Sequence, residues 1–223
     1  MAALVVANDG KPLTPEERSA EQARLDRLVS QPDELRRKRM QEKADTDRTL
    51  RIMRALPDAF LYEYAGEENG LPGIGHIGDP LVKLKFRPNP SYRPPSRVEE
   101  VLTGMQGVIL LDAVHYRIAS IDGTLFKPVS FGWGILGHLN AGGHFLVHQQ
   151  EVDDDDWEIS SMALSFMGKI LLLKSLNLQS TETFSDFKKI APDLSFAQAV
   201  ELLEKSETAN LENHPANGLA EKK

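Results

Sequence analysis

The 223-residue sequence contains no cysteine, so it cannot form a disulfide bond, a thiol nucleophile or a thiolate metal site. Long apolar runs are also missing, because no segment approaches the ~20 apolar residues of a membrane-spanning helix. Basic residues are in the minority, with 26 lysines and arginines against 33 aspartates and glutamates and a net charge of −7. Since an acidic chain neutralises phosphates poorly, we expect no nucleic acid partner.

The chain begins with a short apolar stretch that is followed by a turn. Residues 1–7 lack the basic start and the longer apolar core of a signal peptide, and Asn8-Asp9-Gly10 is a turn signal, so we expect the end of a strand. A strand that begins at an initiator methionine is unusual. We therefore also expect an export signal and one or two strands to be missing upstream.

Two polar helices are predicted next. Thr14-Pro-Glu-Glu17 is a capping box, which starts a helix reaching about Val29. A second helix should begin at Asp33 and end at Pro57. Its last turns carry an apolar stripe that should pack on a sheet: Leu50, Met53 and Leu56.

From residue 59 the apolar period changes to two, which predicts strands. We expect strands at residues 60–65, 81–87, 107–112, 116–122, 143–152, 157–167 and 170–179. A change of phase at Ser160-Ser161 predicts a β-bulge, and Gly168-Lys169 predicts a two-residue hairpin turn. Apolar side chains at helical spacing after Ser96 predict a helix of about ten residues, which includes residues 98–105.

Residues 131–148 hold five of the sixteen glycines and three of the six histidines. Gly132 to Gly137 matches the letters of the dinucleotide-binding fingerprint, but the chain leaves no room for the long helix that must follow, so we expect no nucleotide. His144 and His148 should share one face of a strand, with His138 in the preceding loop. Three imidazoles could bind zinc, but no acidic residue at a fixed spacing supports them, so we predict neither a metal nor another cofactor.

A final helix is predicted after the cap Pro192-Asp-Leu-Ser195. We expect a strand remnant and polar helices at residues 1–55, a sheet domain with helices at 56–205, and a disordered tail at 206–223. The predicted fold class is α+β, mainly β: an antiparallel half-barrel, or unclosed barrel, covered by a few helices.

Three motifs carry a resemblance to known proteins: Leu84-Lys-Phe-Arg-Pro-Asn-Pro90, Leu136-Gly-His-Leu-Asn-Ala-Gly-Gly143 and Phe184-Ser-Asp-Phe-Lys-Lys189. Over roughly residues 12–203 the chain resembles an uncharacterised family of secreted bacterial proteins of acidobacterial type. That family is similar to the outer-membrane lipoprotein-sorting carrier superfamily, which implies a half-barrel lined by apolar side chains, lidded by helices, and a periplasmic or secreted location. No ligand-binding motif of the carriers matches residue by residue, and the loop Pro72 to Pro80 looks like an insertion.

An apolar sheet face predicts the function. Only two helices, at residues 98–105 and 196–203, remain to cover it, so we expect a concavity that binds lipid or acyl chains in a non-catalytic envelope protein. The predicted ligand-binding residues are Val82, Leu84, Phe86, Val108, Leu110, Ile118, Met162, Leu164, Phe166, Leu172, Leu176 and Leu178. Lys174 falls among these leucines, and its amine should reach the rim rather than stay buried.

Two alternatives to a lipid carrier stay open. A fully closed core would make the protein an envelope module for protein interaction or sensing, with a partner that the sequence does not identify. A metal-dependent hydrolase would have to use His138, His144 and His148, which lack a nucleophile or a carboxylate at a suitable spacing.

Overall fold

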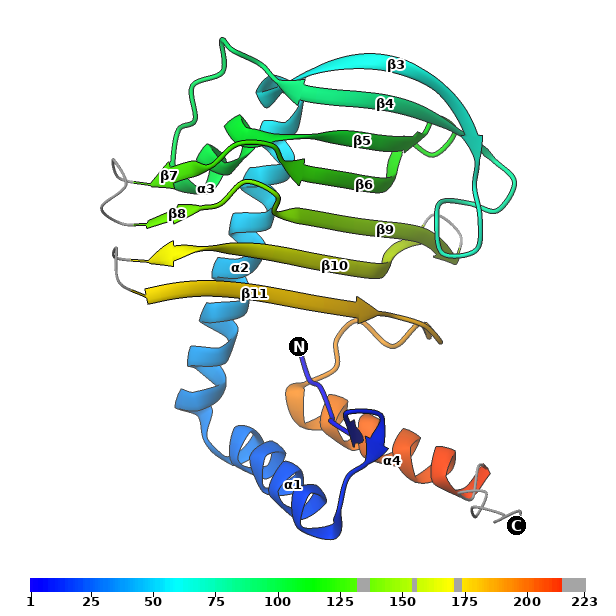
Figure 1. The fold of residues 1–223 in the computed structure, drawn as a ribbon. Helices are drawn as coiled ribbons and strands as arrows, with labels where there is room; N and C mark the ends of the chain where they lie inside the picture. Colours follow the sequence, from blue (N-terminus) through cyan, green and yellow to red (C-terminus); the bar gives the residue numbers. More distant parts are fainter. Residues whose placement is uncertain (132–136, 154–155, 171–173, 214–223) are drawn as a thin grey trace, which may run out of the picture. The chain divides into compact units, whose positions relative to one another are not determined.

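A computed structural model of the chain describes residues 1–131, 137–153, 156–170 and 174–213 (Figure 1). They divide into two compact units. Residues 48–188 contain the large sheet, and residues 1–47 together with the chain from residue 189 onward form the second unit. This division differs from the expected one, in which the last helix belonged to the sheet domain.

The sheet has nine antiparallel strands, which confirms the predicted α+β, mainly antiparallel fold class. In spatial order, β3, β4, β5 and β6 form a meander that continues into β9 and β10, and β10 pairs with both β11 and β8, while β7 pairs with β8 (Figure 1). No pairing among the described residues closes the sheet into a barrel. The strands are β3 (Phe60–Asn69), β4 (Pro80–Pro88), β5 (Met105–Asp112), β6 (Arg117–Leu125), β7 (Val129–Phe131), β8 (Gly137–Leu139), β9 (His144–Asp153), β10 (Asp156–Ile170) and β11 (Lys174–Thr183).

One face of this sheet carries the main hydrophobic core. The end of helix α2 (Pro32–Ala59) packs against it, together with the 3₁₀ turn η1 (Val101–Gly104), which follows the short helix α3 (Arg97–Glu100). The buried members of this core are Leu56, Ala59, Phe60, Phe86, Leu102, Met105, Ile109, Ile121, Leu125 and Val129. We call this side of the sheet the core face and the other side the outer face.

Of the apolar stripe predicted for the end of α2, Leu56 packs against the sheet as expected, whereas Leu50 and Met53 do not. Ile52, Ala55 and Leu56 belong to the core, whereas Leu50 and Met53 are 43% and 37% exposed. Pro57 does not end the helix, which reaches Ala59. A proline in the last turn removes only one of the final hydrogen bonds, and later residues satisfy the carbonyls there: Tyr62 Oη donates to Leu56 O at 2.8 Å.

The hairpin turn predicted at Gly168-Lys169 is not formed. Both residues lie inside β10 and pair with β8 and β11, and the connection to β11 falls outside the described residues. A Cβ at Gly168 would lie 2.1 Å from the carbonyl oxygen of His138, so this glycine permits the close approach of β8 and not a turn. The predicted bulge is confirmed, because the register of β9 and β10 shifts between Ile159 and Ser161.

The predicted ten-residue helix after Ser96 is shorter than expected. Ser96 caps it as predicted, and its hydroxyl accepts from Val98 N. The helix tightens to 3₁₀ geometry at Val101, and Met105 already belongs to β5. Gly104 lies against Val129, where a Cβ would be 2.5 Å from a methyl group, so the chain turns into the sheet at this point.

The second unit contains helix α1 (Pro15–Ser30), the first part of α2, helix α4 (Phe196–Asn213), and the two-residue strands β1 (Ala7–Asn8) and β2 (Lys11–Pro12). Thr14 caps α1 through the predicted capping box, and Asp9-Gly10 forms the predicted turn with positive φ at both residues. Its buried core consists of Leu25, Phe196 and Val200. Helix α4 extends well beyond residue 206, where a disordered tail was expected. None of the described helices is long and apolar enough to span a membrane.

Candidate functional site

The predicted apolar lining is divided between the two faces of the sheet. Side chains that are directly paired across antiparallel strands share a face, and Phe86 pairs with Gly107 while Leu84 pairs with Ile109. Following these pairs across the sheet places nine of the twelve predicted residues on the core face: Val82, Leu84, Phe86, Ile118, Met162, Leu164, Phe166, Leu176 and Leu178. Leu172 lies outside the described residues.

Val108 and Leu110 face the other way, so the prediction of one common lining is wrong for them. Val108 pairs with Lys85 and Leu110 pairs with Lys83, on the outer face. Their neighbours Ile109 and Leu111 take the places on the core face. The segment from Val108 to Leu111 is apolar at every position, so alternation could not show which parity is buried.

The core face is covered differently from the expectation. The last helix was expected to cover this face, but Phe196 and Val200 of α4 are buried against Leu25 of α1, within the second unit. The end of α2 contributes the cover instead, near β3 to β6. Leu178 on β11 remains 43% exposed, and Lys174 on the same strand is exposed, as predicted.

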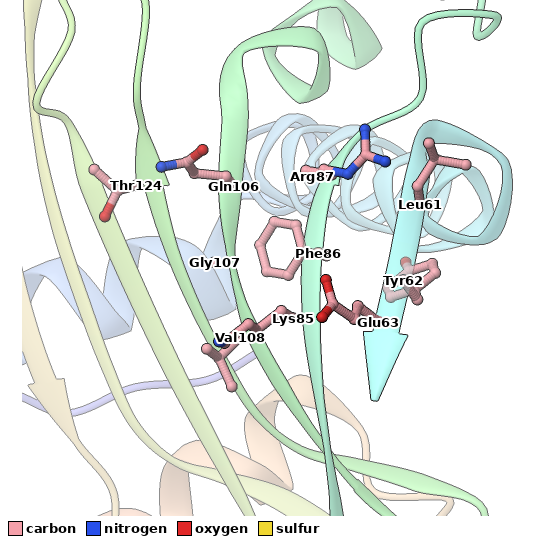
Figure 2. A pocket seen from close by; sticks show the side chains of 10 residues that line it. All are labelled: Leu61, Tyr62, Glu63, Lys85, Phe86, Arg87, Gln106, Gly107, Val108 and Thr124. Atoms are coloured by element: carbon pink, nitrogen blue, oxygen red, sulfur yellow. The ribbon is translucent and has the colours of Figure 1, made fainter. Parts of the chain in front are cut away.

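The outer face is hollowed where β3, β4, β5 and β6 lie side by side (Figure 2). The concavity has a volume of about 630 Å³, which falls within the range of small-molecule sites. Its outward-facing lining residues come from alternate positions on the four strands: Leu61, Glu63, Lys85, Arg87, Gln106, Val108 and Thr124. The intervening Tyr62, Phe86 and Gly107 complete the lining.

The charge of this concavity is predominantly positive. Lys85 and Arg87 lie two residues apart on β4, so both side chains are on the outer face, where they are exposed. Neither forms an ion pair with a described residue, although Glu63 is the cross-strand neighbour of Lys85. Lys83, the next residue in this row, pairs with Glu68. Two unpaired cations therefore lie next to the apolar side chains of Leu61 and Val108.

Tyr62 does not supply an acid or a base to this concavity. Burial raises the pKa of its phenol to about 12. The hydroxyl is already used as a donor to the backbone of α2. Besides the charged side chains of Glu63, Lys85 and Arg87, the concavity contains the amide of Gln106 and the hydroxyl of Thr124, which can form hydrogen bonds to a ligand.

The three histidines singled out in the sequence share the outer face but do not converge. His148 pairs with Ser161, His144 with Ser165, and His138 with Lys169, so they follow β10 at intervals of four residues. Four residues of strand span ~13 Å, which is too far for a shared metal ion or a catalytic dyad. His144 Nε2 instead lies 2.8 Å from Asp122 Oδ1, and burial lowers the pKa of His148.

The glycine stretch before these histidines has no nucleotide-binding context in its described part. Residues 132–136 lie outside the described residues, so the fingerprint itself is not described. Gly137–Leu139, which follow it, form strand β8 and not the helix that a dinucleotide-binding motif opens.

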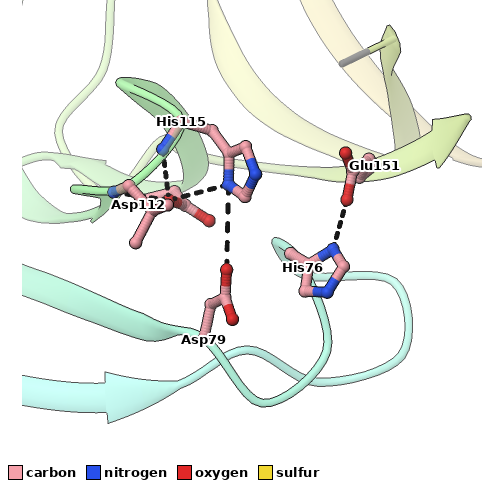
Figure 3. A network of polar contacts seen from close by, with 6 residues as sticks. His76, Asp79, Asp112, His115 and Glu151 are labelled. Carbon is pink, nitrogen blue, oxygen red and sulfur yellow. Dashed lines mark hydrogen bonds and ion pairs between the residues drawn. The ribbon is translucent and has the colours of Figure 1, made fainter. Parts of the chain in front are cut away.

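A second polar cluster was missed in the sequence and is shown in Figure 3. It lies at the start of β4 and the end of β5, which are opposite to the strand ends that line the concavity. Asp79 immediately precedes β4, Asp112 ends β5, and His115 lies in the turn to β6. His115 Nδ1 is 3.2 Å from Asp112 Oδ1 and 3.8 Å from Asp79 Oδ2. One ligand atom from each of these residues lies within 4.8 Å of the others, and no other such group occurs among the described residues.

Local hydrogen bonds hold Asp112 in place. Its Oδ1 accepts from the backbone N–H groups of Val114 and His115, which fixes the β5–β6 turn, and Tyr116 completes that turn with φ of +55°. Burial opposes the charged carboxylate, but the hydrogen bonds from His115 and Val114 prevail and lower the pKa of Asp112. A charged, fully buried carboxylate therefore lies at the end of β5.

Aromatic and charged neighbours surround this cluster. The ring of His115 lies 5.7 Å from that of His76 and 5.8 Å from that of Trp157. His76 Nδ1 forms an ion pair with Glu151, and this hydrogen bond raises the pKa of His76. No sequence pattern predicted a role for these residues. The spacing Asp112-x-x-His115 at a hairpin turn was the one local signal for them, because only the fold brings Asp79 to that turn.

Comparisons with known proteins add no family. No family model matches the chain, and neither the curated proteins nor the solved structures contain a significant match. The resemblance to lipoprotein-sorting carriers and the periplasmic or secreted location therefore stay predictions.

Proposed function

We propose that the protein is a non-catalytic binding protein for an anionic amphiphile, such as a fatty acid, and that the ligand lies in the concavity of the outer face. This keeps the predicted class of ligand and moves its site to the other side of the sheet. The observation that carries the proposal is the pair of exposed cations, Lys85 and Arg87, which lack ion-pair partners among the described residues and lie beside Leu61 and Val108.

The chemistry of the lining supports an acyl ligand with a negatively charged head. A carboxylate or phosphate placed between Lys85 and Arg87 gains charge-assisted hydrogen bonds, which are about twice as strong as neutral ones. Each methylene laid over Leu61 and Val108 gains up to ~0.8 kcal/mol when it leaves water. Leu110 is next to Val108 on the outer face of β5 and extends the apolar strip for a longer chain.

Two measurements test the binding itself. Native mass spectrometry and lipid extraction of the purified protein should detect a co-purifying amphiphile, and a fluorescent fatty acid should bind saturably. A neutral alcohol analogue of the same chain length should bind at least about tenfold more weakly, because it forfeits a charged hydrogen bond of ~1.5–3 kcal/mol. If the protein yields no lipid and no saturable binding, the carrier proposal should be dropped in favour of the protein-interaction alternative.

Matched variants locate the site on one face. Arg87→Gln should reduce fatty-acid affinity about tenfold and leave the alcohol unaffected, whereas Val108→Ser should weaken both. Leu164→Ser is the control on the core face, and Lys169→Gln removes an exposed cation far along β10. Both controls should leave binding unchanged. A loss in Leu164→Ser with none in Val108→Ser would place the ligand on the core face instead.

A further inference from the structure

The Asp79, Asp112 and His115 cluster contains an unsatisfied buried atom. The side chain of Asp112 is 0% exposed, and its second oxygen, Oδ2, has no hydrogen-bond partner among the described residues. Leaving a buried carboxylate oxygen unpaired is costly, more so than for a neutral group. Buried polar atoms in native proteins nearly always have a partner, and a bound metal ion is one of the few partners that fit a buried carboxylate oxygen.

From this cluster we infer a binding site for one divalent transition-metal ion, with zinc as the best fit. Asp79, Asp112 and His115 supply two carboxylates and one imidazole, and water would complete the coordination shell. Nothing in the proposed amphiphile site requires this ion, because the cluster lies outside the lining of the concavity.

The spacing of the donor atoms suits this ion. Zinc holds nitrogen and oxygen ligands at ~2.0–2.2 Å, so neighbouring donors in a tetrahedral site lie ~3.3 Å apart. The measured separations from His115 Nδ1, 3.2 Å to Asp112 Oδ1 and 3.8 Å to Asp79 Oδ2, bracket that value, and Oδ2, the unpaired oxygen of the same Asp112 carboxylate, is the atom left to bind the ion. Only small side-chain shifts are needed, in which His115 Nδ1 turns from Asp112 to the metal.

The kind of donor decides the class of metal. Calcium and magnesium prefer shells made of oxygen alone, whereas an imidazole donor favours zinc and its neighbours in the first transition row. Three protein ligands with a fourth position left to water are a common arrangement for zinc. Asp79 and His115 are partly exposed, at 31% and 21%, so an ion can enter from solvent.

The site would connect two segments that are far apart in the sequence. Asp79 ends the β3–β4 loop, in which Gly78 N donates to Gly70 O, and the other two ligands hold the β5–β6 turn. An ion bound to both would fasten the loop over this end of the sheet, where Gly75 lies against Leu81 and Ala119. Metal removal should therefore loosen the loop without unfolding the sheet.

Zinc binding to the full-length chain tests the inference. Protein stripped with a chelator and dialysed should bind one Zn²⁺ per chain by calorimetry, should melt at a higher temperature with zinc, and should bind Ca²⁺ much more weakly. Trp157 provides a second readout, because its ring is close to that of His115. In a Trp133→Phe background, which removes the other tryptophan, Co²⁺ should quench the remaining emission.

Two single variants should abolish the site. Asp79→Asn and His115→Gln should each weaken Zn²⁺ binding at least ~100-fold. Even mutation of residues that only hydrogen-bond to a metal ligand lowers metal affinity by about 10–100-fold. Both positions are partly exposed, so these variants should fold, which an unchanged melting temperature of the metal-free protein would verify. His144→Gln is the matched control: it breaks another histidine and aspartate pair of the sheet, with Asp122, and should bind zinc normally.

Three results would overturn the inference. The wild-type protein fails to bind Zn²⁺ at a 1:1 ratio, or Asp79→Asn and His115→Gln bind it as tightly as His144→Gln does, or Ca²⁺ binds more tightly than Zn²⁺. None of these results depends on fatty-acid binding, so failure of this inference and failure of the proposed function are separable.

Discussion

Ile109 and Leu110 are adjacent in β5 and similar in size, yet they should contribute very differently to stability. Ile109 is 3% exposed in the core beside α2, whereas Leu110 lies half-buried on the outer face. Ile109→Ala should lower the free energy of unfolding by about 2–5 kcal/mol, because it leaves a cavity in a packed core. Leu110→Ala should cost about 1 kcal/mol. Denaturant unfolding measures both, and equal costs would contradict the face assignment of β5.

His148 should make the sheet unit sensitive to mild acid. Burial lowers the pKa of the folded imidazole below its unfolded value of ~6.5, although the nearby charge of Asp122 opposes this shift. The stability that neutral His148 contributes is present above about pH 6.5 and is lost as the pH falls towards the folded pKa. In His148→Gln the free energy of unfolding should therefore fall less between about pH 7 and pH 5.

His144, on the same strand, provides the control variant for His148. His144→Gln changes a histidine on the same face of β9, but one that is 41% exposed and paired with Asp122. The prediction concerns the slope of stability against pH and not its absolute level. If His148→Gln follows the wild-type slope throughout, burial of His148 does not control the acid response.

Secondary structure elements could be predicted where local chemistry alone decides them. The capping box at Thr14, the Asp9-Gly10 turn and the bulge near Ser160 are properties of a few consecutive residues, and all three are confirmed. Gly168 was misassigned because its role depends on β8, a partner strand thirty residues earlier. A glycine that permits close approach and one that forms a turn look the same in a sequence.

The candidate sites were harder to predict than the elements. Alternation gave the correct face for β4, where lysines separate the apolar residues, and failed for β5, where both parities are apolar. The concavity on the outer face requires four strands in register. The cluster of Asp79, Asp112 and His115 requires Asp79 to lie beside the β5–β6 turn, more than thirty residues away in the sequence. The concavity leaves no motif, and the cluster leaves only the Asp112-x-x-His115 spacing, because both arrangements are produced by strand order and pairing.

At the scale of the whole molecule, the two units have separate hydrophobic cores of very different size. Among the described residues, the sheet unit buries ten apolar side chains in its main cluster, whereas the helical unit buries Leu25, Phe196 and Val200. Since stability rises with the apolar surface that a unit buries, the helical unit should be the less stable one. We expect its amide protons in α1 and α4 to exchange faster than those of β5 and β6.

Leu25→Ala tests whether the units are independent. Leu25 is 0% exposed, so removing its side chain should cost the helical unit about 2–5 kcal/mol, a large share of what so small a core provides. Hydrogen exchange should then accelerate throughout α1 and α4, and protection of β5 and β6 should stay at its wild-type level. Val29→Ala, also on α1 but 43% exposed, should change neither unit. Equal loss of protection in both units would mean that they unfold as one cooperative structure. Destabilising the smaller core would then lower the stability of the sheet as well.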